Sequence, residues 1–248
     1  MRAKPLTESQ KQQILNMYGK YSCVEISNKL NVTLNQVYDL RKRLKITNKQ
    51  NLVFEVNEIQ NQILLSGKLG DGNYKSNGKY NAYYRESHAS DELGYLKWKA
   101  NELKNMLSSK GIIKINIDFN NNKSFAVQQP YYFMTKTSPT FANYQKLSID
   151  ETISKLNEKG LIMFMLDDGW YTNHSCKGNF CISGGRLTLN QMESICSQFE
   201  KFNIRNVHII GKVRQDFYIP SENNNILYEI ATSFIPKDTD IIIKKFKK

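Results

Sequence analysis

The stretch "GLIMFMLDDGWYTN", residues 160–173, places two neighbouring aspartates at the end of an apolar segment. Six bulky apolar residues, 161–166, predict a buried helix that ends on Asp167 and Asp168, before a glycine and a tryptophan. The C-terminal end of a helix carries partial negative charge, so carboxylates at that end are unfavourable. We therefore expect a positive group to compensate for these two aspartates.

A second stretch repeats this pattern. Residues 63–74, "ILLSGKLGDGNY", form another apolar helical segment that ends on an aspartate, Asp71, followed by glycine and an aromatic residue. Asp71 and Asp168 are 97 positions apart (168 − 71), and similar segments follow both in the same order. Each half is predicted as helix, strand, strand, helix, strand, strand, helix. A tandem duplication of one α/β unit explains this order.

The predicted segments correspond pair by pair. They are strands within 79–87 and 178–185, helices within 90–107 and 188–202, strands within 112–119, 125–134, 206–213 and 214–220, and closing helices at about 140–148 and 222–234. Two such copies usually pack about a pseudo-twofold axis. We expect the motif helices to make that contact, with small residues (Ser66, Gly67, Gly70) facing large ones (Met163, Phe164, Leu166).

Two parallel helices packed in this way end side by side, which brings Asp71 and Asp168 together. The two carboxylates repel each other and the helix dipoles, and a divalent cation between them removes both penalties. The sequence therefore predicts a metal ion at the paired helix ends. The alternative is that each Asp-Gly is only a turn signal.

Composition limits the class of protein. The 248 residues contain 35 Lys and Arg against 23 Asp and Glu, a net charge of +12, with 14 Tyr and 12 Phe. This balance favours a polyanionic partner such as nucleic acid, and a merely basic soluble protein is the alternative. A hydrophobic content of 40% is enough for a packed core.

The sequence also predicts where the protein is found. It contains no apolar run of about 18 residues that would span a membrane, and the segment 1–13 lacks a signal peptide. Four irregularly spaced cysteines (Cys23, Cys176, Cys181, Cys196) favour a reducing compartment and free thiols over a zinc site with His174. We expect a bacterial or phage cytoplasmic protein, or an organellar one, and not a secreted one.

The first 46 residues predict three helices, at about 8–18, 23–30 and 34–44. Each begins with a capping box, in which a hydroxyl and a Glu or Gln three residues later cap each other's backbone; the boxes are Thr7–Gln10, Ser22–Glu25 and Thr33–Gln36. The second and third helices around a short turn resemble a helix-turn-helix unit, which lays its second helix in the major groove of DNA.

Charge supports that interpretation. Residues 1–48 carry nine Lys and Arg against three Asp and Glu (9 − 3 = +6), half of the net charge. The candidate DNA-binding residues of the third helix are Asn35, Gln36, Asp39, Arg41, Lys42 and Arg43. The alternative is a three-helix bundle that binds a protein.

The segments "LLSGKLGDG" (64–72) and "LIMFMLDDG" (161–169) resemble the two motifs of LAGLIDADG homing endonucleases, in the monomeric form with both motifs on one chain. Further similar segments are "YLKWKANEL", "YYFMTKTSPTF", "LTLNQMESI" and "FIPKDTD", so that the resemblance covers roughly residues 57–240. The bulky Phe164-Met165 pair and the chain after Pro236 depart from the family pattern.

The resemblance implies a metal site and its roles. The last aspartate of each motif, Asp71 and Asp168, would bind Mg²⁺ or Mn²⁺, and Ca²⁺ is expected to substitute without supporting cleavage. Gly70 and Asp167, at the neighbouring motif positions, complete the candidate metal group. Lys136 would be one basic catalytic residue, and Lys244 or Lys245 the second; the alternative for each lysine is ordinary solvated charge.

The strands of each half would form a sheet in the major groove, with alternate side chains on DNA. The candidate DNA contacts are Asn73, Lys75, Tyr83, Arg85, Tyr171, Asn173, Lys177 and Arg186.

The sequence thus predicts an α+β protein with an N-terminal all-α helix-turn-helix domain and two pseudo-symmetric αββαββα repeats. The expected boundaries are 1–46 for the first domain, 47–56 for a linker, 57–149 for repeat 1 and 150–248 for repeat 2. The expected function is site-specific cleavage of double-stranded DNA with a long asymmetric target, by a monomer, leaving 3′ overhangs. The alternative is a non-cleaving binder of DNA or RNA on the same scaffold, such as a transcription regulator or an intron maturase.

Overall fold

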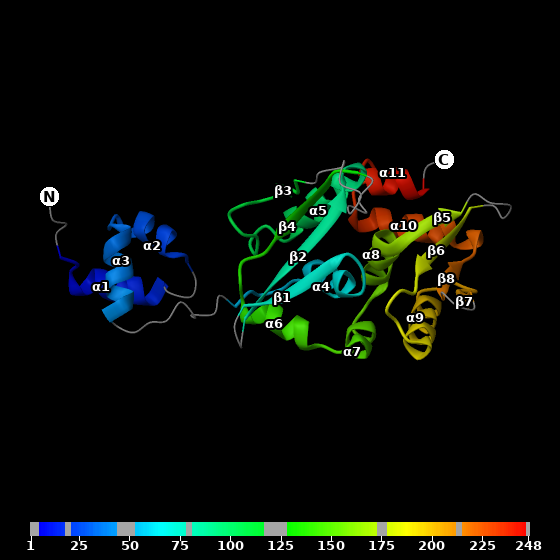
Figure 1. Ribbon diagram of the computed structural model, residues 1–248, viewed down its shortest axis with the longest axis horizontal. Coiled ribbons are helices and arrows are strands. Elements are labelled where there is room, and N and C mark those ends of the chain that lie inside the picture. The colour runs from blue at the N-terminus through cyan, green and yellow to red at the C-terminus, as the bar shows by residue number, and fades with distance from the viewer. Residues whose placement is uncertain are drawn as a thin grey trace.

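The protein has an α+β fold with two antiparallel four-stranded sheets, as the sequence predicts (Figure 1). This computed structural model describes residues 5–17, 21–43, 53–77, 81–116, 128–172, 178–211 and 215–246. The first sheet has the order β1-β2-β4-β3 and the second β5-β6-β8-β7. Because both halves have the same strand order, the internal repeat is confirmed.

The strands and α-helices of the two halves correspond one to one, and each half adds one 3-10 helix at a different place. The first half contains α4 (Glu58–Leu69), β1 (Gly72–Ser76), β2 (Ala82–Ala89), η1 (Ser90–Glu92), α5 (Leu93–Glu102), β3 (Ile113–Lys114), β4 (Pro130–Met134) and α6 (Pro139–Lys146). The second half contains α8 (Glu158–Asp168), β5 (Gly169–Thr172), β6 (Asn179–Ser183), α9 (Leu189–Lys201), β7 (His208–Ile210), β8 (Asp216–Ile219), η2 (Ser221–Asn223) and α10 (Asn224–Phe234). Two further helices, α7 (Ile149–Ser154) and α11 (Asp240–Phe246), were not predicted.

The N-terminal segment folds into the three predicted helices: α1 (Glu8–Met17), α2 (Cys23–Leu30) and α3 (Leu34–Arg43). All three capping boxes form, with the Ser22 and Glu25 side chains each accepting from the other's backbone N–H. Asn31 ends α2 in the left-handed region, with φ 51°, so that α3 can start after a short turn. Ile14, Ile26, Val37 and Leu40 form the core of these helices.

The two motif helices, α4 and α8, lie side by side between the two sheets (Figure 1). At their N-terminal ends, Asn157 of the α8 cap donates to Glu58 at the start of α4 over 2.8 Å. At their C-terminal ends, a β carbon added to Gly70 would lie only 2.9 Å from that of Asp167. The helices are therefore parallel and end together, as predicted.

The expected packing of Gly67 and Phe164 between the motif helices is wrong. A β carbon on Gly67 would lie 1.9 Å from the Tyr84 hydroxyl, in the sheet of its own half. Phe164 also faces its own sheet, where its ring meets Phe217 edge-on with centroids 6.2 Å apart. The two residues occupy equivalent positions. The Tyr84 side chain from the sheet takes up the space beside Gly67 in the first half, and the Phe164 ring from the helix takes up this space in the second half.

The unpredicted helix α11 connects the second half back to the first. The carboxylate of Asp240, in its first turn, accepts from the backbone N–H groups of Gly94 and Tyr95 at 2.5 and 2.9 Å. These groups belong to the first turn of α5, where a carboxylate is favourable. The contact fixes α11 beside α5 and η1 of the first half.

Three of the four cysteines lie in the part of the chain that the structure describes. Cys23, Cys181 and Cys196 are free thiols, as predicted, whereas His174 and Cys176 lie outside the described residues. Among the helices of the described ranges, none has the length and apolar character that crossing a membrane requires.

Candidate active site

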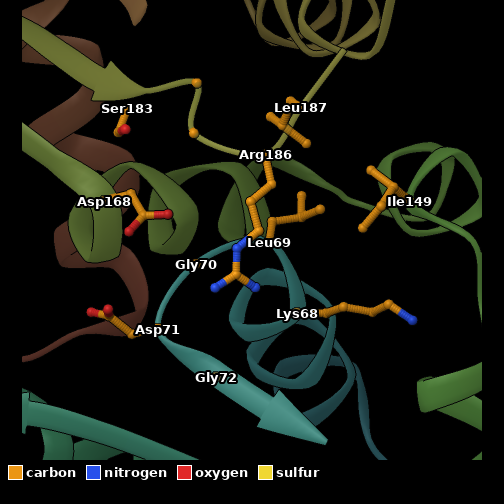
Figure 2. Close-up of a pocket in the computed structure, with 12 residues that line it drawn as sticks. Lys68, Leu69, Gly70, Asp71, Gly72, Ile149, Asp168, Ser183, Arg186 and Leu187 are labelled. Carbon is orange, nitrogen blue, oxygen red and sulfur yellow. The ribbon is translucent and has the colours of Figure 1, made fainter. Parts of the chain in front are cut away.

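A cavity of about 360 Å³ lies at the paired ends of α4 and α8 (Figure 2). Asp71 and Asp168 both line it, so the structure brings the two motif aspartates into one site as predicted. Arg186 extends into the same cavity from the segment after β6, whereas Lys68 turns away (Figure 2). The Lys68 ammonium donates to the carbonyls of Tyr144 and Gln145, both at 2.9 Å, at the end of α6.

Asp167, next to Asp168, points into the protein instead of the cavity. Its side chain is fully buried, and both of its oxygens accept from the Lys99 ammonium of α5, at 2.7 and 3.0 Å. The sequence predicts a positive group that compensates for the charge of Asp167, and Lys99 is that group. Sequence reasoning did not identify it.

Lys99 belongs to a buried cluster of charged residues. Its ammonium also contacts the carboxylate of Glu86 on β2, and both of those side chains are completely buried. The second Glu86 oxygen accepts from the Tyr84 hydroxyl. His88 lies between two glutamates, with Nε2 2.9 Å from Glu86 Oε1 and Nδ1 3.1 Å from Glu92 Oε2. The cluster reaches the cavity because His88 Nδ1 lies 3.5 Å from Asp71 Oδ2.

The electrostatics of the cavity disfavour ionised aspartates in the protein without a cation. Burial, and next the charge of Asp167, raise the pKa of Asp71 to about 7 and that of Asp168 to about 6. Burial lowers the pKa of His88, but its hydrogen bonds to Glu86 and Glu92 outweigh burial and raise the pKa to about 10. His88 is therefore a cation at neutral pH and donates from both nitrogens.

The donors at the cavity fit a hard divalent cation. Two carboxylates with raised pKa values share one space, and carboxylate and carbonyl oxygens are the ligands that Mg²⁺ and Ca²⁺ prefer. Single ligand atoms of Asp71, His88 and Asp167 also lie within 4.8 Å of one another. However, the glutamates occupy both His88 nitrogens and Lys99 occupies Asp167, which leaves Asp71 and Asp168 as the available pair.

The lysines expected to assist catalysis lie at different distances from the cavity. The strand register pairs Gly72 with Glu86 and Glu86 with Phe133. Lys136 is three residues beyond Phe133, so it lies about 10 Å along the sheet towards the β1–β2 hairpin. Its catalytic role stays a prediction.

Lys244 and Lys245 have different environments. The Lys244 ammonium pairs with Asp91 and Glu92 at 2.8 and 2.7 Å, and its side chain is 42% exposed. Lys245 is buried and donates to the carbonyl of Gly169, the residue after Asp168. Burial lowers the pKa of Lys245. Of the two lysines left open by the sequence, Lys245 is the one in contact with the motif end.

The expected DNA-binding side chains of the first half share one face of the sheet. Cross-strand pairing joins Asn73 with Arg85 and Lys75 with Tyr83. Tyr83 and Arg85 alternate with buried residues of β2, and Asn73 and Lys75 are the exposed residues on either side of half-buried Tyr74 in β1. The Arg85 guanidinium also stacks on the Tyr132 ring, 4.0 Å from its centroid. This face is the one directed away from the core.

The second half differs. Tyr171 lies on the inner face of its sheet, where its ring packs against Phe180, and Trp170 takes the outward position with 39% exposure. Asn173 and Lys177 lie outside the described residues. In α3, Asn35, Asp39, Lys42 and Arg43 are exposed, but Gln36 accepts from Thr33 and Arg41 Nη1 contacts the Cys23 sulfur at 3.6 Å.

Comparison with known proteins agrees with the fold. The sequence model of the LAGLIDADG DNA endonuclease family matches residues 61–227, and the chain belongs to this family. Among solved structures, the chain is similar to the homing endonuclease I-WcaI bound to its DNA recognition sequence, with 17% identity, a TM-score of 0.61 and coverage of 83% of this chain and 92% of that one.

A further similar structure is the meganuclease I-SmaMI bound to uncleavable DNA, with 10% identity, a TM-score of 0.45 and coverage of 75% of this chain and 87% of that one. No curated protein sequence matches significantly.

Proposed function

We propose that the protein is a site-specific endonuclease that hydrolyses both strands of a long asymmetric DNA target as a monomer. The observation that carries the proposal is the convergence of Asp71 and Asp168 in one cavity, at the ends of two motif helices of this family. A pure binder has no need for two carboxylates whose ionisation burial disfavours.

The proposed chemistry needs divalent cations of the Mg²⁺ or Mn²⁺ type, which supply a water of lowered pKa and stabilise charge on the phosphate. Asp71 and Asp168 would hold them, and Lys245 would stabilise negative charge beside Gly169. The outward face of each sheet would hold DNA in its major groove, through Asn73, Lys75, Tyr83 and Arg85 in the first half. A staggered cut with 3′ overhangs is the outcome that family membership favours.

The proposal is tested by a cleavage selection. The protein is incubated with a randomised DNA library and Mg²⁺, and the cut ends are sequenced by run-off. We expect one long asymmetric consensus, cut on both strands. Specific binding to DNA without any cutting in Mg²⁺ or Mn²⁺ would favour the alternative, a non-cleaving regulator or RNA-binding maturase.

The raised pKa values predict how cations stabilise the protein as pH changes. For Asp71 and Asp168 the folded state holds protons up to about pH 7 and about pH 6, above the ordinary value of 3.8. Their ionisation therefore makes the cation-free protein less stable as pH rises from about 4 to about 7. A bound cation removes this penalty. Thermal melts with and without Ca²⁺ should show a larger increase in Tm at pH 8 than at about pH 5.5; an equal increase at both would contradict the site.

The N-terminal helices are proposed to be a second DNA-binding unit, with exposed Lys42 near the phosphates and Asn35 near base edges. Replacing Lys42 with Gln should reduce affinity for all sequences equally and lower the log–log salt slope by about 0.9.

The matched comparison is Gln36→Ala. The Gln36 side chain completes the capping box with Thr33, accepting from its N–H at 2.8 Å, so this variant should mainly lose about 1 kcal/mol of stability. Binding at several salt concentrations, beside melting curves, separates the two effects. An unchanged slope for Lys42→Gln would indicate a partner other than DNA.

A further inference from the structure

The buried ions Glu86, Lys99 and Asp167 form a three-residue set that the proposed reaction does not use directly. Two come from the first half and one from the motif of the second half. Lys99 lies between the two carboxylates, and its ammonium also rests 4.4 Å from the centroid of the Tyr95 ring. All three side chains are completely shielded from solvent.

The three positions that the internal repeat relates to Glu86, Lys99 and Asp167 carry no charge. Gly169 pairs with Ile182 as Gly72 pairs with Glu86, so Ile182 corresponds to Glu86. The buried residues of α9 are Met192, Ile195 and Phe199. At a constant offset of 96 positions they match three buried residues of the first half, Leu96 and Lys99 in α5 and Leu103 at its C-cap, so Ile195 corresponds to Lys99. Asp167, in the motif, corresponds to Gly70 in the first motif.

The second half packs the equivalent place between helix and sheet without ions. Ile182 and Ile195 are both 0% exposed, so the same pocket between helix and sheet closes with an apolar pair. Buried ion pairs are commonly no more stabilising than well-packed apolar residues of similar size. All three charges occur in this set, and none occurs at the three positions related to it by the internal repeat. This all-or-none difference points to a joint role.

We propose that Lys99 is a positioning residue: with Glu86 it holds Asp167 as a fixed anion behind the cavity, and Asp167 strengthens cation binding by Asp71 and Asp168 without being a ligand itself. The inference rests on the proposed function, because it needs the cation at Asp71 and Asp168.

The geometry around Gly70 supports this role. A β carbon at Gly70 would lie 3.3 Å from Asp167 Oδ2 and 3.5 Å from Asp168 Oδ2, so the two carboxylates flank the same point of the first motif. Glycine at position 70 leaves the space that Asp167 occupies. The Asp167 carboxylate is therefore placed where its negative charge acts directly on a cation held by Asp71 and Asp168.

The experiment separates packing from charge. Lys99→Met alone takes the cation from buried Asp167 and one partner from Glu86, so it is expected to destabilise the folded protein. The informative variant is the triple Glu86→Ile, Lys99→Ile, Asp167→Asn, which copies the apolar pair of the second half and replaces Asp167 with a neutral side chain of the same shape. Asp167→Asn alone is its companion. Glu193→Gln, which removes an exposed carboxylate from α9, is the control for net charge.

Mg²⁺ and Ca²⁺ affinities are measured by calorimetry on the full chain, with melting curves in parallel. Both Asp167→Asn and the triple variant should bind the cations about 10- to 100-fold more weakly, while the triple variant keeps a cooperative melt and the Glu193 control binds as the wild type does. Wild-type cation affinity in the triple variant would overturn the inference. The three residues would then serve only to pack the space between helix and sheet.

Asp71→Asn and Asp168→Asn are measured in the same series. If these two variants lose cation binding and the triple variant does not, only the inference about Lys99 fails. If they too bind like the wild type, the proposed metal site itself fails.

Discussion

Replacing Asp71 or Asp168 with asparagine is expected to abolish double-strand cleavage while DNA binding is retained. Each substitution removes the negative charge that a divalent cation needs, from one of the two available carboxylates in the cavity. The loss of cation-dependent transition-state stabilisation corresponds to several kcal/mol, so cleavage should fall at least about 1,000-fold. Because burial makes both ionised side chains unfavourable, neither change should destabilise the protein without cations.

The measurement is cleavage of the selected target in Mg²⁺, beside binding in Ca²⁺. Asp238→Asn is the matched control, because it removes one exposed aspartate outside the cavity. Cutting of both strands at the wild-type rate by either motif variant would refute the metal assignment. Joint loss of folding and binding would instead assign the aspartates a structural role.

Replacing Lys245 with methionine is expected to reduce the cleavage rate by about 100- to 1,000-fold, in line with the loss of one group that stabilises transition-state charge. The Lys245 ammonium is buried and bonded to the carbonyl that follows Asp168. Methionine keeps the apolar stem, so α11 should stay packed.

Lys244→Met is the comparison for this prediction. Lys244 makes a partly exposed ion pair with Asp91 and Glu92, whose side chains are 37% and 12% exposed. Exposed pairs contribute about 1 kcal/mol or less. We expect a small change in Tm and nearly unchanged cleavage. Single-turnover rates and melting curves of both variants decide between them; an inactive Lys244→Met beside an active Lys245→Met would reverse the choice of catalytic lysine.

The sequence predicted what depends on local patterns. Capping boxes fix helix starts within a few residues, and all three N-terminal helices begin where the boxes indicate. Repetition of a motif located Asp71 and Asp168. Strand alternation left open which side chains of β1 and β2 face outward, and the register in the structure places Asn73 and Arg85 on that face. The fold class followed from the order of elements.

The rest depends on contacts between distant parts of the chain. Lys99 and Asp167 are 68 residues apart, and a lysine in an amphipathic helix looks like surface charge until its partner is known. The helices α7 and α11 are six and seven residues long, too short for a periodic pattern. Tyr171 was predicted to contact DNA but lies on the inner face, because the face of each residue depends on where pleating begins, here at Gly169 directly after the helix.

The one-sided charge set also limits how such proteins can evolve and be recombined. A chimera that joins this first half to a foreign second half without an aspartate at position 167 would leave Lys99 with one buried partner fewer. A protein made from two copies of the second half would contain two aspartates equivalent to Asp167. Each would face an isoleucine, Ile195, at the position where Lys99 compensates for Asp167 in this chain. After duplication, any single step towards the present set would have buried an uncompensated charge, so the halves of this chain are no longer interchangeable parts.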